Sequence, residues 1–311
     1  MNTRKNALSI CCYVCAFGAF GAFFRWLQNQ IAVDHTTGVL KPSMWNVLVP
    51  VIIIAAAAVF YFIIRRRMET NVFATGIHET FRATTALHDY VAWFVGIIVM
   101  LGGLMLMVSS RLDALAGACR FIGILAILTG LTFPSVCTAS RRHLSPNLVS
   151  IFSVIPIAMY CLWLITCYRR NSNIPNVYSF CIEIIAVCAI IVALYNIAGY
   201  PFGVPKPYAS LYSSMLAAFM CLMTLADNRY FGMQLILFGT AAMLLMYSWM
   251  IVGNMKTAGD SSAKAAAAAG AAIKNPPEPE ISEDTVIPAG ADMSGAEPTR
   301  QADTIRVDDK D

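Results

Sequence analysis

One stretch of the sequence constrains the fold more than any other. Residues 47–64, VLVPVIIIAAAAVFYFII, contain no charge and run directly into the triplet Arg65, Arg66 and Arg67. Together with residues 44–46, the stretch reaches the roughly 20 residues that a helix needs to cross the hydrocarbon core of a bilayer. Arginines directly after such a helix indicate its cytoplasmic end. The stretch therefore predicts a transmembrane helix and gives it a direction.

The composition points to lipid as part of the solvent. The chain is 58% hydrophobic and 13% charged, with a mean hydropathy of +0.63. A soluble domain is about 45–50% apolar and about 25% charged. A larger soluble core cannot absorb this difference, so we expect the lipid bilayer to be the main partner of the chain.

The charges divide the chain into two parts. Residues 1–256 hold 17 Lys/Arg and 7 Asp/Glu, whereas residues 257–311 hold 5 Lys/Arg and 11 Asp/Glu. The basic residues of the first part lie mostly at the ends of apolar runs, which fits topology control and not nucleic-acid binding. The second part is rich in Ala, Pro and acidic residues, and it cannot bury enough surface to offset chain entropy. We therefore predict a transmembrane helix bundle over 1–255 and a disordered cytoplasmic tail over 256–311.

The apolar runs predict an all-α polytopic bundle of about eight transmembrane helices in the cell membrane. The first run is too long for a typical signal-peptide core and lacks a small-x-small cleavage site, so it is expected to be retained. With eight spans, both the amino terminus and the carboxyl terminus are cytoplasmic. The predicted helices cover residues 7–24, 44–64, 90–110, 115–136, 148–168, 177–198, 208–226 and 230–252.

The number of spans has one alternative. Eight spans place ten basic residues inside and six outside, and Arg169 and Arg170 are then on the outer side. If residues 148–168 re-entered the membrane without crossing it, the count would be eleven to five, with seven spans and the tail outside. The 21 uncharged residues of this run favour a crossing helix.

Residues 65–89 form the longest predicted loop of the membrane part, on the cytoplasmic side. The spacing of Phe73, Ile77, Phe81 and Leu87 predicts a short amphipathic helix over 73–87 at the membrane surface. This loop and the tail are the two segments expected to contact a soluble protein partner.

Glu183 is the most informative single residue. It lies about seven residues into the predicted helix 177–198, roughly 10 Å deep at ~1.5 Å per residue. A carboxylate at that depth is costly and should face a partner charge, other protein groups or water. We predict that Glu183 pairs with Arg120, with Arg25 as the second choice. The pair would be either an ion or proton site that opens outward or a structural link between helices, and Glu183 could instead be protonated.

The sequence predicts no catalytic residue, no cofactor and no metal site. His78-Glu79 and His88-Asp89 offer possible zinc ligands, but the ten-residue spacing is not the H-E-x-x-H geometry, so helix capping explains them better. The ten cysteines, including Cys12 and Cys15, lie in or beside apolar runs and fit packing roles. No phosphate loop, nucleophile elbow or dinucleotide fingerprint is visible, which argues against a soluble-type catalytic domain.

A short motif near the amino terminus adds a resemblance. Residues 23–28, FFRWLQ, are followed by residues 34–39, DHTTGV. This combination resembles the first-helix-and-loop pattern of uncharacterised bacterial polytopic membrane proteins, and it covers about 17 of the 311 residues. The resemblance implies a bacterial inner membrane protein and no particular activity.

Three classes of function remain from the sequence. The chain is a transporter or permease component, or a membrane-embedded sensor, scaffold or assembly partner that acts through the 65–89 loop and the tail. An intramembrane enzyme is the third class. The sequence identifies no small-molecule substrate.

Overall fold

The computed structural model describes residues 2–32, 43–68, 71–72, 77–81, 86–109, 115–138, 144–171 and 178–257. The long helices in these ranges are α1 (Asn2–Ile31), α2 (Trp45–Met68), α4 (Ala86–Ser109), α5 (Ala116–Cys137), α7 (Pro146–Asn171), α8 (Tyr178–Ala198), α9 (Pro207–Thr224) and α10 (Phe231–Gly253). One short helix, α3 (Ile77–Thr80), and two short strands, β1 (Asn71–Val72) and β2 (Lys256–Thr257), complete the described elements. The predicted all-α class is confirmed.

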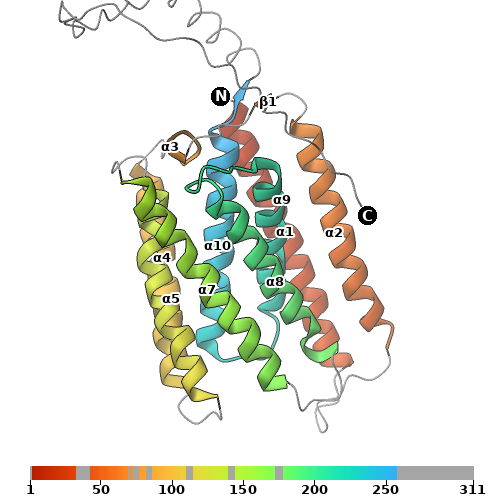
Figure 1. Cartoon of the computed structure of the whole chain (residues 1–311). Coiled ribbons are helices and arrows are strands. Elements are labelled where there is room, and N and C mark those ends of the chain that lie inside the picture. Colours follow the sequence, from red (N-terminus) through yellow and green to blue (C-terminus); the bar gives the residue numbers. More distant parts are fainter. Residues whose placement is uncertain are drawn as a thin grey trace, which may run out of the picture. The chain divides into compact units, whose positions relative to one another are not determined.

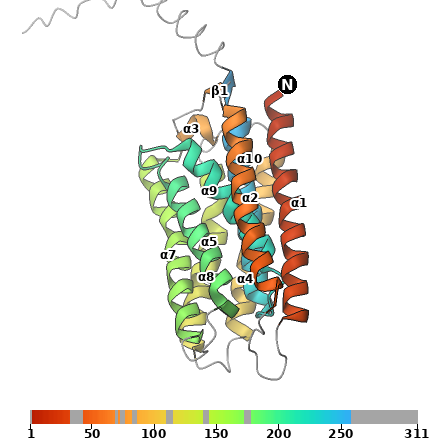
Figure 2. The same cartoon turned by 90° about the vertical axis from the view of Figure 1, so that its right-hand side faces the viewer.

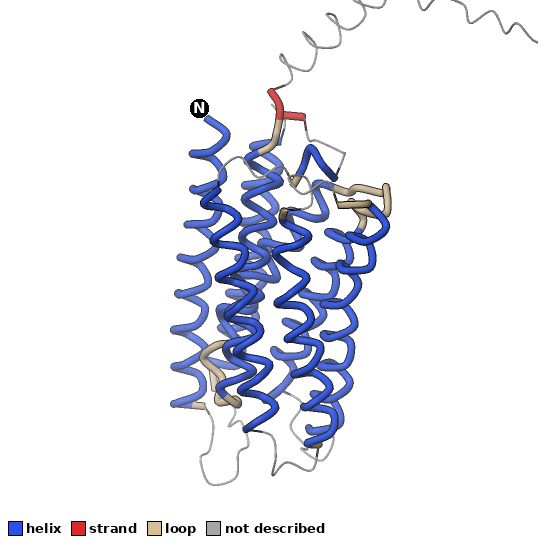
Figure 3. Tube along the Cα trace, turned by 90° about the vertical axis from the view of Figure 1, so that its left-hand side faces the viewer, coloured by secondary structure: helices blue, strands red, loops and turns tan. Residues whose placement is uncertain are grey.

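The eight long helices lie side by side and alternate in direction (Figures 1 and 2). α1 begins at the end of the bundle where β1 and α3 lie, and α10 finishes at that same end. Figure 3 shows the strand pair above this end, which we call the strand end. The turn over residues 225–230, between α9 and α10, lies at the other end, which we call the opposite end.

Seven of the eight long helices are long and apolar enough to cross a membrane, which makes the chain a multi-pass integral membrane protein. α7 is one of them, and it continues through Pro156 as a single helix of 26 residues. The structure therefore shows no re-entrant segment at residues 148–168, and the arrangement with eight helices holds in the described residues.

The eighth long helix, α9, contains three buried serines, Ser210, Ser213 and Ser214. α9 contacts α1, α2, α8 and α10, so it is surrounded by other helices and is not spread along the lipid boundary. Ser210 donates a hydrogen bond to the carbonyl of Lys206 at 2.9 Å, and Ser213 donates one to the carbonyl of Ala209 at 2.6 Å. The backbone of α9 thus satisfies the hydroxyls of Ser210 and Ser213, which lets a helix within the bundle tolerate them.

Two predictions about the segments outside the long helices have different outcomes. Of the predicted helix over 73–87, residues 73–76 and 82–85 lie outside the described residues; the described part holds the four-residue α3, a turn at Phe81 and the start of α4 at Ala86, so one helix does not continue through Phe81. Phe81 is fully buried, so its apolar side chain serves the bundle and not the membrane surface. The predicted disordered tail lies outside the described residues beyond Thr257, and its boundary at residue 256 stays a prediction.

Reciprocal glycines set the closest helix contacts. A Cβ built on Gly96 of α4 would collide with the carbonyl oxygen of Gly130 of α5, and a Cβ on Gly130 would collide with that of Gly96. Gly102 of α4 and Gly232 of α10 face each other in the same way. Because lipid tails give apolar helices no reason to associate, close backbone approach at small residues is a main source of packing energy. α4 is therefore held by glycine contacts on two sides.

The contact of Gly96 with backbone gives the first prediction. Gly96→Val should lower the free energy of unfolding by at least about 1–3 kcal/mol, because α4 and α5 must move apart. Gly117→Ala is the matched control, since a Cβ on Gly117 meets nothing within 4 Å. Thermal unfolding of both variants in detergent, followed by tryptophan fluorescence, measures the difference. Equal melting temperatures for the two variants would contradict the packing described here.

Candidate functional site

Four charged side chains form a continuous chain at the opposite end of the bundle. Arg25 Nε of α1 lies 2.7 Å from Asp227 Oδ1, and Arg229 Nη2 lies 2.7 Å from Asp227 Oδ2. Arg229 Nε also lies 3.3 Å from Glu183 Oε2 of α8. We call Arg25, Asp227, Arg229 and Glu183 the charge cluster. In the order of contacts from Arg25 through Asp227 and Arg229 to Glu183, the charges alternate in sign, and they sum to zero.

The charge cluster is largely shielded from solvent. Arg25 is 2% exposed, and the side chains of Arg229 and Glu183 are 8% and 16% exposed. A buried charge is tolerated only when an opposite charge and hydrogen bonds replace its hydration. Each carboxylate of the cluster has at least one arginine beside it, so this condition is met.

Polar and aromatic groups extend the charge cluster to further helices. Trp163 Nε1 of α7 donates to Glu183 Oε1 at 2.9 Å. Arg25 Nη1 donates to Gln28 Oε1 at 2.7 Å, and Gln28 Nε2 donates to Asn46 Oδ1 of α2 at 3.1 Å. Groups from α1, α2, α7, α8 and the α9–α10 turn therefore meet in one hydrogen-bonded network.

Local structure explains how the cluster is assembled. Arg25 and Gln28 are three residues apart on α1, which puts them on one face of that helix. The turn after α9 is held by the Asp227 amide, which donates to the carbonyl of Thr224, and by Gln234 Nε2, which donates to the carbonyl of Asp227 at 3.1 Å. This short turn presents Asp227 and Arg229 together.

The structure gives Glu183 a different partner from the predicted one. Glu183 contacts Arg229, whereas the side chain of Arg120 is exposed on α5. Arg25, the second predicted choice, pairs with Asp227 and so belongs to the same cluster as Glu183. α5 packs against α7, and α7 packs against α8, so α5 is not the neighbour that Glu183 faces.

Sequence reasoning missed Asp227 and Arg229. Both residues lie between the predicted helices 208–226 and 230–252, where the sequence pattern assigns them no role. The available signal was that Asp227 follows its predicted helix at the same membrane level as Arg25 and carries the opposite sign. Matching opposite charges at equal depth could have identified the pair of Asp227 and Arg25. It could not have ranked this pair above the predicted pair with Arg120.

The guanidinium of Arg170, near the end of α7 at the opposite end of the bundle, contacts groups of neighbouring helices. Its guanidinium lies 5.2 Å from the ring centroid of Tyr230, Nη2 lies 3.5 Å from Cys119 Sγ, and Nη1 lies 3.9 Å from Met233 Sδ. These contacts join α7 to α5 and α10. Arg170 is therefore held by protein groups.

A second polar arrangement lies at the strand end. β1 and β2 pair antiparallel, with Asn71 opposite Thr257 and Val72 opposite Lys256. Nearby, Asn254 Nδ2 donates to the carbonyl of Thr80 at 2.7 Å. We call β1, α3 with Phe81, and residues 254–257 the loop–tail junction. It joins the described part of the 65–89 loop to the chain that leads into the tail.

An aromatic group supports the loop–tail junction from the bundle side. The ring centroid of Phe81 lies 5.3 Å from that of Tyr200 and 5.6 Å from that of Tyr247, both edge-on. Such edge-to-face pairs add about 0.5–1.5 kcal/mol beyond the buried area. Burial raises the pKa of Tyr200 to about 12, so its hydroxyl stays neutral at physiological pH.

The residues considered for metal or redox chemistry have simple surroundings. All ten cysteines are free thiols. Within the described residues, no three His, Cys, Asp or Glu side chains come together as a set of metal ligands. His88 lies in the wall of an apolar pocket.

The central position of Asp227 gives the second prediction. Asp227→Asn keeps the size of the side chain but removes the charge that neutralises Arg25, so the free energy of unfolding should fall by about 3–5 kcal/mol. Arg120→Gln removes an exposed charge and serves as the control, with no comparable loss. The measurement is the melting temperature in detergent at neutral pH. Adding Arg25→Gln to Asp227→Asn should restore part of the loss, and a further additive loss would speak against the pairing.

Comparisons with known protein families, curated proteins and solved structures find no match for this chain.

Proposed function

We propose that this membrane protein is a scaffold or sensor in which the 65–89 loop and the base of the tail act as one platform for a soluble protein partner. The observation that supports it is the loop–tail junction. The sequence suggests the loop and the tail as two separate contact segments, and the junction bonds them to each other.

The bonds of the loop–tail junction couple the two segments mechanically. The β1–β2 pairing uses backbone hydrogen bonds, so it sets the position of residues 71–72 relative to residues 256–257. The bond from Asn254 to Thr80 adds a side-chain link from the end of α10 to α3. A partner that displaces one segment must therefore strain or release the other.

The helix bundle behind the loop–tail junction is suited to act as a rigid support for it. Fully buried large side chains fill its interior, among them Tyr160, Trp163 and Phe219. At the opposite end, Glu183 and Asp227 are already engaged by arginines. A helix bundle with a packed interior and paired charges at one end suits a platform. It suits a carrier less well, because a carrier must open alternately to both sides of the membrane.

We place the strand end in the cytoplasm. Arg65 and Arg66 lie at the strand end of α2, and Arg65–Arg67 follow the most apolar run of the chain. Clusters of basic residues beside a membrane helix favour the cytoplasmic side. The proposed platform is then accessible to soluble cytoplasmic proteins.

The third prediction tests the platform. Asn254→Ala removes a bond of about 0.5–1.5 kcal/mol, and Val72→Pro puts a residue with a fixed φ and no N–H into β1. Both should raise amide hydrogen exchange in residues 71–81 and 254–257. With a biotin ligase fused after residue 311, soluble neighbours labelled in the wild type should lose their labelling in both variants.

Arg120→Gln is the control for this experiment, because Arg120 is exposed on α5 and has no part in the junction. A neighbour counts only if Arg120→Gln leaves its labelling unchanged. If the exchange rises in both variants while every labelled neighbour stays the same, the platform has no role in partner contact and the proposal fails.

A transporter or permease component is the second candidate. It is favoured by Glu183, a carboxylate inside a candidate membrane span whose charge is matched by an arginine from a neighbouring turn. In this candidate the charge cluster would be a gate that opens by exchange of its partners. Proteoliposome uptake that depends on Glu183 and survives Asn254→Ala would favour the transporter over the platform.

A further inference from the structure

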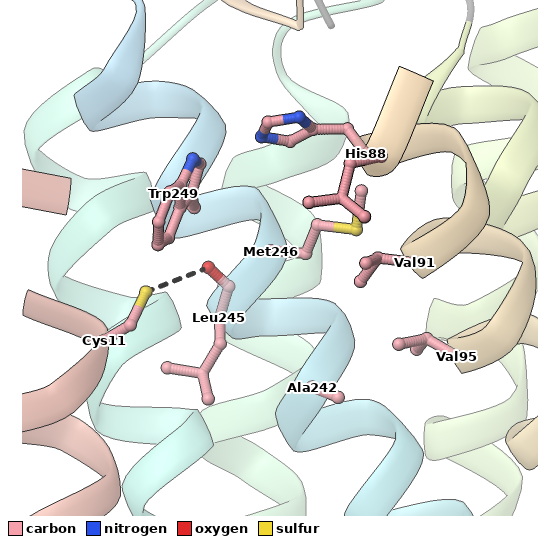
Figure 4. A pocket seen from close by; sticks show the side chains of 9 residues that line it. Cys11, His88, Val91, Val95, Ala242, Leu245, Met246 and Trp249 are labelled. Atoms are coloured by element: carbon pink, nitrogen blue, oxygen red, sulfur yellow. Dashed lines mark hydrogen bonds between the residues drawn. The ribbon is translucent and has the colours of Figure 1, made fainter. Parts of the chain in front are cut away.

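An apolar pocket lies between α1, α4 and α10, near the strand end. Its volume is about 340 Å³. Figure 4 shows Cys11 of α1 on one side, Val91 and Val95 of α4 on the other, and Ala242 and Met246 of α10 between them. α10 packs against both α1 and α4, and the pocket fills the space between these two walls.

The pocket changes in character along the helix axes. His88 and Trp249 line it at the strand end, and their ring centroids lie 6.2 Å apart. Deeper into the bundle, the walls come from Val95 and Ala242 (Figure 4). Aromatic and amphipathic side chains are typical of the interface between membrane and water, whereas the deeper walls match hydrocarbon.

The dimensions of the pocket suit one hydrocarbon chain. The seven steps along α4 from His88 to Val95 correspond to about 10 Å at ~1.5 Å per residue. This is shorter than one leaflet, which is about half of the ~30 Å hydrocarbon core. A volume of 340 Å³ is about twice that of the ~150 Å³ cavity that accommodates benzene, so it has room for the first part of one chain.

The pocket is open toward the surroundings of the bundle. Val91, on its wall, is 42% exposed, and Leu87, also on its wall, is 65% exposed. α4 is a candidate membrane span from Leu87 to Ser109, so the medium beside these residues is lipid. A lipid chain can therefore enter sideways without passing through water.

We propose that this pocket is a binding site for one acyl chain of a phospholipid from the adjacent leaflet. The chain lies along Val91, Val95 and Ala242, and the ester and phosphate region lies at the level of His88 and Trp249. The imidazole of His88 offers the glycerol or phosphate oxygens a hydrogen-bond donor at that level. The lipid fits in this direction because its polar part then lies beside His88 and Trp249 at the strand end and its acyl chain lies beside the apolar walls deeper in the bundle.

Photo-crosslinking in nanodiscs tests the proposal. The probe is a phosphatidylcholine with a diazirine in its sn-2 chain, and the crosslinks are mapped on the tryptic peptides 83–111 and 230–256, which contain α4 and α10. Peptide 26–65, which contains most of α2 because trypsin does not cut between Lys41 and Pro42, reports ordinary lipid contact through Ile54 and Phe62, which are 69% and 66% exposed. In the wild type, crosslinks should concentrate at the pocket residues and exceed those on α2 at equal exposure.

Two variants fill the pocket from different sides. Ala242→Phe and Val91→Phe should each reduce crosslinking at the pocket to the level of the α2 peptide. Ala58→Phe is the matched control, because Ala58 is exposed on α2 and the same bulk there closes no pocket. Ala58→Phe should leave the crosslinks in peptides 83–111 and 230–256 unchanged. Val91→Phe secures the result if Ala242→Phe does not fold.

Two outcomes would overturn the site. One is labelling of the pocket residues that equals that of the α2 surface in the wild type, which would mean ordinary boundary lipid. The other is pocket labelling that persists in a folded Ala242→Phe or Val91→Phe protein. His88→Phe gives an additional readout, because loss of the donor should shift the crosslinks along α4 without changing those on α2.

Discussion

Asp227 is the residue on which the opposite end of the bundle depends. Its carboxylate lies beside Arg25 and Arg229 and also accepts from Asn29 Nδ2 at 3.2 Å. In a poorly hydrated environment, an arginine without a counter-charge costs several kcal/mol, so the positions of both arginines follow that of one carboxylate. Because Arg25 belongs to α1 and Arg229 to the α9–α10 turn, Asp227 decides where these segments meet. Glu183 then connects the same group to α8.

The middle of the bundle is stabilised in a different way. α4 lies between α5 and α10, and it meets each of them through glycine: Gly96 faces Gly130, and Gly102 faces Gly232. These contacts bring backbones together without placing any charge in the hydrocarbon region. Some hydroxyls in the interior are satisfied in pairs, as between Tyr160 and Thr240 at 2.6 Å. Ionic interactions are therefore needed only where the helices approach the membrane surface.

The sequence predicted the helices well because a long apolar run is a local signal. The predicted helix over 115–136 is observed over 116–137, and the one over 230–252 is observed over 231–253. The partner of Glu183 was not predictable in the same way. Apolar runs and charge bias give the depth of a residue in the membrane, and Arg120 and Arg229 have similar expected depths. The lateral order of the helices decides between them, and that order depends on contacts between residues far apart in the chain.

Phe81 shows a related limit. Its spacing from Ile77 fits an amphipathic surface helix, and the periodicity alone cannot distinguish a membrane surface from the end of a helix bundle as the apolar partner. The structure resolves this through Tyr200 and Tyr247, which lie 119 and 166 positions further along the chain and form the surface that buries Phe81. The burial of Phe81 against residues distant in the sequence therefore outweighed its local preference for a surface helix.

The two ends of the bundle are therefore held by interactions of different strength. The opposite end has buried ion pairs that salt screens only weakly and that join α1, α8 and the α9–α10 turn. Among the described residues, the strand end has a ladder of two residues on each strand, a bond from Asn254 to the carbonyl of Thr80 and a group of aromatic contacts. Local opening in a protein begins where few buried contacts must be broken. Motion should accordingly concentrate at the loop–tail junction, while the charge cluster keeps the helices at the opposite end in place.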